Sequence, residues 1–406
     1  MGIQREFLGQ RIIASALLAC GVLLGMASTS SADEYWVSDR ATGRVLALDA
    51  TSGAFLRVIA STGLHQPTNL TKGPDGFLYV SDIGPLALAP IVRIDPSNGN
   101  ATAFPATLPP LFGAGGIISD NQSIFVSEIG QFNGDEVYEF LPAGGAPLNV
   151  IGTGSTASGR TGMAFDSAGD LYVSSFGEGA GFSGSVLKHD GGSGFTTFAS
   201  GVAAGSQPLS GANGLAFDSA GDLYVAGLFS QNVIKYPVTD GVSGEGVQFG
   251  ANLPYPSGLL VHSDGGRESL LITSLGNDNL LDPIYPGMIF PGAVYRYNLA
   301  TGTAINFLVA DFDRDLVVDA DDLTVWRSSF GGGAAADADG DGDSDGADFL
   351  LWQQNLGNQG VLGDFQPTGI ILHVTNPSPA AVPEPAAAAM AALAACVLAG
   401  AGRLRR

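Results

Sequence analysis

Short apolar runs alternate with turn residues along most of this 406-residue chain. The phrase Gly-Leu-Ala-Phe-Asp-Ser-Ala-Gly-Asp-Leu-Tyr-Val at 214–225 shows the pattern: a brief apolar run, a polar turn containing glycine, and a triplet of residues that favour β-strands. Nearly the same phrase stands 52 residues earlier, at 162–173, and a looser copy ends at Val80. Self-similarity at this period indicates a repeat architecture built from strands.

Triplets of large apolar residues mark the repeat, and successive triplets end 43 to 52 residues apart. They are Tyr35–Val37, Leu78–Val80, Ile124–Val126, Leu171–Val173, Leu223–Val225 and Leu270–Ile272. A second apolar strand follows each triplet, and most repeats add a turn and another short run, such as Phe55–Ile59. Four short strands in about 47 residues is the size of a propeller blade. Residues 33–310 therefore predict an all-β, six-bladed β-propeller.

The repeat resembles the NHL-repeat and gluconolactonase-like six-bladed propellers. The resemblance covers about 280 residues and rests on the apolar run, the Asp-Ser-Ala-Gly-Asp turn and the Leu-Tyr-Val triplet. It implies the fold, but a propeller can carry many functions, so it does not fix what this chain does.

The first blade lacks an innermost strand, because a mature chain that starts at Asp33 leaves only two residues before Tyr35. Propellers usually close by taking a strand from the other end of the chain. Residues 366–374, in a linker at 361–381, begin with Gln-Pro-Thr, as does the inner strand of the second repeat at Gln66. We therefore hypothesise that 366–374 completes the first blade. The alternative is an extended linker beside a three-stranded blade.

Two twelve-residue loops rich in aspartate lie between residues 311 and 348. Loop 1 offers Asp311, Asp313, Asp315, the backbone carbonyl of Val317, Asp319 and Asp322. Loop 2 offers Asp337, Asp339, Asp341, Asp343, Asp345 and Asp348. Oxygen ligands at positions 1, 3, 5, 7, 9 and 12 are the pattern of an EF-hand calcium loop. The sequence therefore predicts two Ca²⁺ sites.

A short helix with one apolar face is predicted after each loop, at 323–330 and 349–356. The pair resembles a dockerin-type calcium repeat, so we expect a small α-helical, EF-hand-like module at 311–360. Both loops lack a long preceding helix and end in Asp rather than Glu, and loop 1 has Leu316 where glycine is usual. The resemblance implies docking onto a cohesin-like partner. An intramolecular structural role and an acidic, disordered linker are the alternatives.

The two ends of the chain predict export. Residues 1–32 have a basic start, a 15-residue apolar run and small residues before Asp33, as in a signal peptide, with a membrane anchor as the alternative. The C-terminal motif consists of Val382, Pro383, Glu384 and Pro385. With the apolar run and basic end that follow, residues 382–406 resemble the PEP-CTERM sorting signal. This implies an exosortase as partner, a hydrophobic transmembrane helix before processing, and delivery to the cell surface or extracellular matrix; a simple tail anchor is the alternative.

Polar residues at the start of the innermost strands are candidates to line the propeller channel. They are Asn69, Arg160, Thr161, Asn213 and Ser257. In gluconolactonase-like enzymes, asparagines at such positions bind a divalent metal together with Glu and Asp, and the resemblance implies this role for Asn69 and Asn213. No acidic partners are evident in the sequence, because Asp39, Asp82 and Glu128 follow triplets and fit equally well as turn residues.

The net charge and the positions of the cysteines make some partners and some chemistry less suitable for this chain. The net charge of −22 disfavours nucleic acid and anionic membrane surfaces as partners. The only cysteines, Cys20 and Cys396, lie in the terminal segments, so residues 33–382 use neither disulfides nor thiol chemistry. We expect an exported surface or matrix protein whose propeller is a binding platform, with extracellular polysaccharide as one conceivable partner. The alternatives are a secreted metal-dependent hydrolase or lactonase and a component of a carbohydrate-degrading assembly. The absence of a clear acid cluster among the expected channel residues favours the binding platform over an enzyme.

Overall fold

The computed structural model describes residues 33–84, 90–105, 114–129, 136–152, 159–178, 182–201, 208–249, 253–264, 266–277 and 291–375. The expected signal peptide at 1–32 and the sorting signal at 382–406 lie outside these residues. Within the described parts of the chain, no helix combines the length and the apolar composition that a membrane crossing requires.

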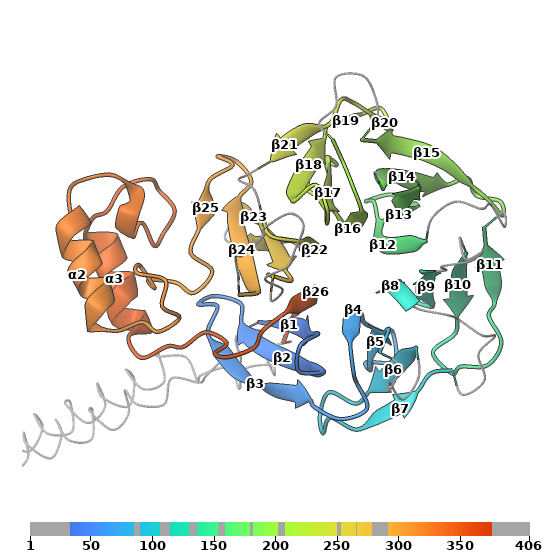
Figure 1. The fold of residues 1–406 in the computed structure, drawn as a ribbon, viewed down its shortest axis with the longest axis horizontal. Coiled ribbons are helices and arrows are strands. Elements are labelled where there is room, and N and C mark those ends of the chain that lie inside the picture. Colours follow the sequence, from blue (N-terminus) through green and yellow to red (C-terminus); the bar gives the residue numbers. More distant parts are fainter. Residues whose placement is uncertain are drawn as a thin grey trace, which may run out of the picture. The chain divides into compact units, whose positions relative to one another are not determined.

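Six four-stranded antiparallel sheets follow one another around a ring, which confirms the predicted six-bladed propeller (Figure 1). Blades 1 to 3 are β26 (Pro367–His373), β1 (Glu34–Asp39), β2 (Arg44–Asp49), β3 (Phe55–Ala60); β4 (Pro67–Lys72), β5 (Leu78–Asp82), β6 (Ile91–Ile94), β7 (Ala101–Ala103); and β8 (Ala114–Ser119), β9 (Ile124–Glu128), β10 (Val137–Phe140), β11 (Asn149–Ile151). Blades 4 to 6 are β12 (Arg160–Phe165), β13 (Leu171–Glu178), β14 (Ser183–His189), β15 (Phe195–Ser200); β16 (Ala212–Phe217), β17 (Leu223–Gly227), β18 (Asn232–Tyr236), β21 (Val247–Phe249); and β22 (Pro256–Asp264), β23 (Arg267–Ser274), β24 (Ala293–Asn298), β25 (Ala304–Ile305). A small hairpin, β19 (Val238–Thr239) with β20 (Val242–Ser243), extends from blade 5.

The repeated Asp-Ser-Ala-Gly-Asp phrase forms the turn between the first two strands of blades 4 and 5. In blade 5, one carboxylate oxygen of Asp218 accepts the backbone N–H groups of Ala220 and Asp222 at 3.0 and 2.9 Å, and the other accepts the Tyr224 hydroxyl at 3.2 Å. Gly221 has φ +88°, a conformation that glycine adopts without steric cost. The first aspartate and the glycine of the phrase close this turn, while Ser219 reaches Glu268 of blade 6 and Asp222 pairs with Lys235.

Inner strands of neighbouring blades approach each other closely. A Cβ atom at Gly162 or Gly214 would overlap a backbone carbonyl of the next blade, so these positions require glycine. Buried hydroxyls on the second strands bridge the blades: Ser127 donates to the Thr161 carbonyl, and Ser174 to the Asn213 carbonyl, both at 2.6 Å. The ring is thus held by buried hydrogen bonds as well as by apolar packing between blades.

The closing strand has the pairing that the Gln-Pro-Thr phrase predicts: β26 pairs antiparallel with β1 along Glu34–Asp39. The Asp39 carboxylate accepts the Gln366 backbone N–H at 3.0 Å, as Asp82 accepts that of Gln66 at 2.9 Å. The buried hydroxyl of Thr368 then reaches the Pro67 carbonyl of blade 2 at 2.9 Å. The repeated phrase therefore encodes the same anchoring contacts at both ends of the chain.

Residues 311–360, which we call the aspartate-loop module, lie between β25 and β26 (Figure 1). The module contains α2 (Ala320–Ser329), the 3₁₀ turn η1 (Ala334–Ala336) and α3 (Gly346–Asn355). Both helices begin three residues earlier than the apolar pattern predicts, at 320 and 346 rather than at 323 and 349. The reason is capping: Asp319 and Asp345 are the N-caps, and each forms a capping box with the aspartate three residues later.

Candidate metal loops and the propeller channel

The carboxylates of each aspartate loop converge. In loop 1, oxygen atoms of Asp311, Asp313 and Asp315 lie within 4.8 Å of one another. In loop 2 the same holds for two overlapping groups, which are Asp337, Asp339 and Asp348, and Asp343, Asp345 and Asp348. Within the described residues, these are the places where three or more potential metal ligands of this kind meet.

Hydrogen bonds from the backbone hold the first and last carboxylates of each loop in place. In loop 1, Asp311 accepts the N–H groups of Asp315 and Leu316, both at 3.1 Å. The buried Asp322 accepts from Phe312 at 2.6 Å with one oxygen and from Asp319 at 2.7 Å with the other. The loop is therefore folded around carboxylates at positions 1 and 12, which are ligand positions of an EF-hand loop.

Loop 2 repeats this arrangement with different residue types. Asp337 accepts from Gly342 at 2.9 Å, and Asp348 accepts from Ala338 and Asp345, both at 2.7 Å. Positions 4 and 6 have positive φ in both loops, at +78° and +101° for the glycines of loop 2. Loop 1 reaches the same conformation without glycine, since Leu316 has φ +73°. A non-glycine residue there costs about 1–2 kcal/mol, so loop 1 is strained where loop 2 is not.

The two halves of the module support each other reciprocally. The indole N–H of Trp326, on α2, donates to the Asp345 carbonyl at 2.8 Å, and that of Trp352, on α3, donates to the Asp319 carbonyl at 2.7 Å. Each tryptophan thus bonds the N-cap residue of the other helix. The alignment of the two tryptophans was visible in the sequence, but this exchange requires the antiparallel placement of the helices and was missed.

Burial and neighbouring charges raise the pKa values of several loop carboxylates. Burial, helped by Asp322 and Asp313, raises the pKa of Asp311 to about 6, against the opposing effect of two backbone N–H groups. Burial also raises the pKa of Asp313 and Asp339, and the charge of Asp341 is the main cause that raises the pKa of Asp343. The carboxylates repel one another, which a bound cation would reverse.

The donor set of both loops fits a hard divalent cation. All the side-chain donors are carboxylates, which Ca²⁺ prefers over nitrogen or sulfur. Six Asp residues in each twelve-residue loop, with only Arg314 as a cation in either loop, supply more negative charge than one ion needs. The negative charge, the convergence of the carboxylates and the backbone hydrogen bonds that hold them make Ca²⁺ chemically suitable for both loops.

The module packs against blade 1 of the propeller. Ala54, in the turn between β2 and β3, belongs to the same apolar cluster as Phe312, Val318 and Trp352. The backbone N–H of Phe55 donates to the Gln359 carbonyl, and that of Val309 to the Ser52 carbonyl, both at 2.8 Å. Sequence reasoning missed this junction, because Ser52 and Ala54 look like ordinary turn residues.

Four of the five expected channel residues line one cavity of about 180 Å³: Asn69, Thr161, Asn213 and Ser257. The amide of Asn213 donates to the Ser257 hydroxyl at 3.2 Å. The Asn69 side-chain oxygen accepts the Leu70 N–H at 2.8 Å. None of the described residues that line this cavity, or the neighbouring one of about 330 Å³, is acidic. The described lining therefore lacks the carboxylates that would bind a metal together with asparagine.

Arg160 does not join these residues. It is buried at the start of β12, and its guanidinium carbon lies 5.8 Å from the ring centroid of Phe195. Asp39 and Asp82 do not supply the missing acids either, because they hold the backbone ahead of Pro367 and Pro67, as described above. Glu128 accepts the Tyr138 hydroxyl at 3.4 Å. These acids have the local structural contacts of turn and strand-end residues.

Comparisons with known proteins concern the fold alone. No family model and no curated protein sequence matches the chain. Similar solved structures include a nidogen/laminin complex (16% identity, TM-score 0.49, covering 68% of this chain and 92% of that chain) and a gluconolactonase, XC5397, from Xanthomonas campestris (16%, 0.45, 68% and 84%). Another is a virginiamycin B lyase from Staphylococcus aureus (15%, 0.43, 67% and 86%). At such identities and scores, these similarities say nothing about ligand or reaction.

Proposed function

We propose that the aspartate-loop module binds two calcium ions and that calcium fixes this module on the propeller. The observation that carries the proposal is the convergence of carboxylates in both loops on backbone already folded for ligation. Calcium would offset the burial and the mutual repulsion that together raise the pKa values of Asp311 and Asp339.

The position of the module in the chain gives calcium a structural role. The module connects β25 of blade 6 to β26, the strand that closes blade 1. Its apolar core includes Ala54 of the propeller. Ordering the loops therefore shortens the effective connection to β26 and lowers the entropy cost of closing the ring. The contacts with blade 1 favour this intramolecular role over that of a freely tethered docking module.

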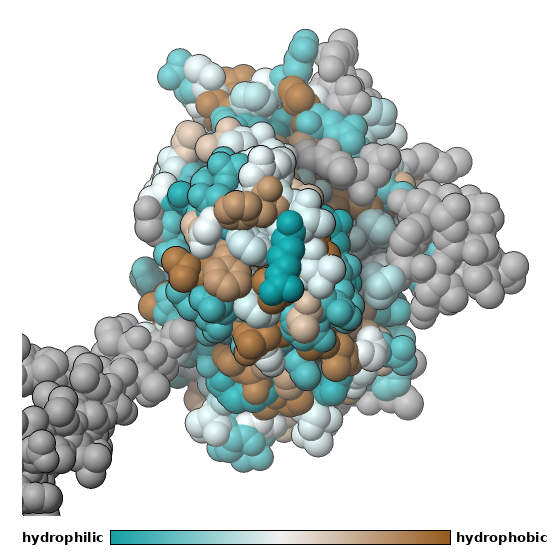
Figure 2. All heavy atoms as spheres, turned by 90° about the vertical axis from the view of Figure 1, so that its left-hand side faces the viewer, coloured by the Kyte–Doolittle hydropathy of each residue, from teal (hydrophilic) through white to brown (hydrophobic). Residues whose placement is uncertain are grey.

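Docking onto a cohesin-like partner is the second candidate. Phe330 and Leu356, which cap the C-termini of the two helices, and Leu350 are exposed. On the face seen in Figure 2, apolar and hydrophilic side chains are interspersed. The Phe330→Ser and Leu356→Ser variants would weaken such docking without changing calcium affinity, which size-exclusion chromatography with a cohesin domain can measure.

For the whole protein, we propose an exported surface or matrix protein whose propeller is a binding platform. The proposal draws on the signal-like N-terminus and the Pro-Glu-Pro sorting motif with its implied exosortase. The alternative of a metal-dependent hydrolase or lactonase is weakened, because the described channel lining offers amides and hydroxyls without a carboxylate.

Calorimetric titration of calcium into the chain from Asp33 onward tests the proposal. The wild type should bind two ions, and a variant with Asp311, Asp313, Asp337 and Asp339 changed to Asn should bind none. A control with four exposed or half-exposed turn aspartates of the propeller changed to Asn has the same net charge and should keep both sites; these are Asp95, Asp120, Asp190 and Asp240. A site that survives in the loop variant would place a metal in the propeller and revive the hydrolase.

A further inference from the structure

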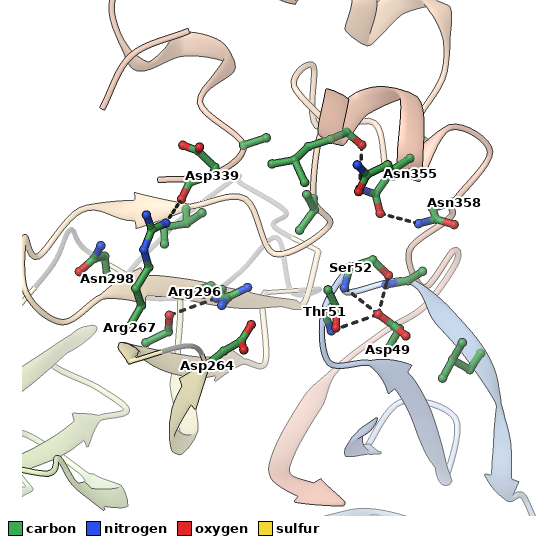
Figure 3. A pocket seen from close by; sticks show the side chains of 18 residues that line it. Asp49, Thr51, Ser52, Asp264, Arg267, Arg296, Asn298, Asp339, Asn355 and Asn358 are labelled. Carbon is green, nitrogen blue, oxygen red and sulfur yellow. Dashed lines mark hydrogen bonds between the residues drawn. The ribbon is translucent and has the colours of Figure 1, made fainter. Parts of the chain in front are cut away.

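A cavity of about 530 Å³, with both polar and apolar lining, lies where blades 1 and 6 meet the aspartate-loop module (Figure 3). Blade 6 contributes Arg267, Arg296 and Asp264, while the turn after β2 contributes Thr51 and Ser52. The module supplies the opposite wall through loop 2 and α3. The volume is in the range of sites that hold small organic ligands.

Arg296 is the most informative residue of this cavity. It is half-buried on β24, and its Nε donates to the Ser269 hydroxyl at 3.2 Å. The described residues offer no acceptor to its two terminal NH₂ groups. Figure 3 shows the guanidinium within the cavity. A guanidinium presents its donors in one plane and suits bidentate contact with an oxyanion or with neighbouring hydroxyls.

Uncommitted polar groups surround this arginine. Asp264 and Gln354 line the cavity and are exposed to solvent, and within the described residues their side chains make no hydrogen bond or ion pair. By contrast, Asp49 is engaged in its own turn, accepting from Thr51 at 3.0 Å and from Ser52 at 2.7 Å. The cavity thus offers donors on Arg296, acceptors on Asp264 and both on Gln354.

We propose that this cavity is a saccharide-binding site that prefers an acidic sugar unit. Hydroxyl groups both donate and accept, so a polyhydroxylated ligand can satisfy Asp264, Gln354 and Arg296 together, whereas a purely apolar ligand would leave them unpaired. The preference for a carboxylate comes from Arg296. Two arginines and three aspartates line this cavity, but Arg267 is engaged with the Asp339 carbonyl and Asp49 with its own turn. Asp339 is a ligand of loop 2 in the proposed function, so Arg296 and Asp264 are the charged groups left to meet a saccharide.

The proposed site rests on the proposed calcium function, because the module forms one wall. Asp339, at position 3 of loop 2, lines the cavity, and its carbonyl accepts the Arg267 guanidinium at 2.8 Å (Figure 3). Calcium in loop 2 would order Asp339 and the start of α3 and thereby fix the wall that carries Gln354. Saccharide binding should therefore weaken when calcium is removed.

Calorimetry with the mature chain and calcium tests the site. The probes are trimers of glucuronate, galacturonate and mannuronate, the methyl ester of each, and inorganic sulfate. At least one acidic trimer should bind, and Arg296→Gln should weaken it about 10- to 100-fold, the range expected for a charge-assisted hydrogen-bonding group. Arg327→Gln is the matched control, because Arg327 is exposed on α2 and has the same charge. It should leave the affinity unchanged.

Each outcome is decisive for one proposal. If no trimer binds while calcium still binds, the saccharide site is wrong and the calcium module stands. If calcium does not bind, the proposed function itself fails. Sulfate that binds as well as the trimers would show a general anion site and overturn the saccharide assignment. Trimer binding that survives both Arg296→Gln and a calcium chelator would place the saccharide elsewhere on the protein.

Discussion

The propeller and the aspartate-loop module differ in how their carboxylates are paired. In the propeller, carboxylates such as Asp39, Asp82 and Asp218 accept backbone N–H groups, and the cations Lys188 and Lys235 pair with Asp170 and Asp222 at 2.7 and 2.8 Å. In the module, twelve Asp stand against two Arg between residues 311 and 357.

The difference shows where each region obtains its stability. Many charged side chains of the described propeller residues pair with a backbone N–H group or with an opposite charge. The module uses its backbone N–H groups to orient twelve carboxylates that have only two arginines to balance them. Burial, together with neighbouring carboxylates, raises the pKa values of Asp311 and Asp339. We expect a region of this kind to gain stability when a cation binds. The predictions below test this contrast.

Removing calcium should have the largest effect, and that effect should be concentrated in the module and in blade 1, which the module contacts. At free calcium 100 times the dissociation constant, two sites contribute about 5 kcal/mol to the free energy of unfolding of the module. A chelator should therefore increase hydrogen exchange in 311–360 and change the fluorescence of Trp326 and Trp352, while amides in blades 2 to 5 keep their protection. Equal loss of protection in both regions, or in neither, would contradict the comparison.

Breaking the ring closure should have the next largest effect and should be confined to the propeller. Thr368→Val removes buried hydrogen bonds to Ser38 and Pro67 and should lower the free energy of unfolding by about 1–3 kcal/mol. Chemical denaturation measures the change. Thr102→Val on the outer strand β7 is the control and should cost less than about 0.5 kcal/mol, because its hydroxyl is exposed. Calcium affinity should be similar in both variants.

Lowering the pH should affect the module in a way that depends on calcium. In the metal-free module, burial raises the pKa of Asp311 to about 6, above its ordinary value of 3.8, so the folded state binds this proton more tightly than the unfolded chain does. Without calcium, the free energy of unfolding of the module should therefore rise as the pH falls from 7 through 6.

With calcium present, the same proton competes with the ion. Loop-1 affinity should fall by up to about tenfold for each pH unit below 6. Calorimetry between pH 7.5 and 5 can follow this loss together with the proton release on binding. An affinity that stays constant to pH 5 would show that Asp311 does not take part in binding.

Exchanging the residues at position 6 of the two loops should have the smallest effect. Leu316→Gly relieves the strain of positive φ but increases the entropy of the unfolded chain, so the net gain should stay below about 1 kcal/mol. Gly342→Leu should destabilise loop 2 by a similar amount or more. Thermal unfolding of the metal-free chain compares the two variants. A loss of stability in Leu316→Gly would mean that the leucine side chain contributes packing that outweighs its strain.

The sequence by itself determined the elements and their number. Triplets of consecutive apolar residues and glycine turns favour strands through local backbone preferences, and the spacing of the aspartates predicts the turns of the two loops, because both kinds of signal act within a few residues. The Gln-Pro-Thr phrase even predicted the partner of β1, since identical anchoring contacts require identical residues.

Only the tertiary structure decided which distant side chains share a site. Arg160 is the first residue of β12, whereas Asn213 is the second residue of β16, and this offset of one residue puts Arg160 beside Phe195 instead of in the described channel lining. Arg296 and Gln354 are 58 residues apart and meet because the module packs on blade 1. Which distant side chains come together depends on how the elements pack against one another. The preference of a single residue for helix or strand does not encode this packing, because the free energy of packing arises between two surfaces in contact.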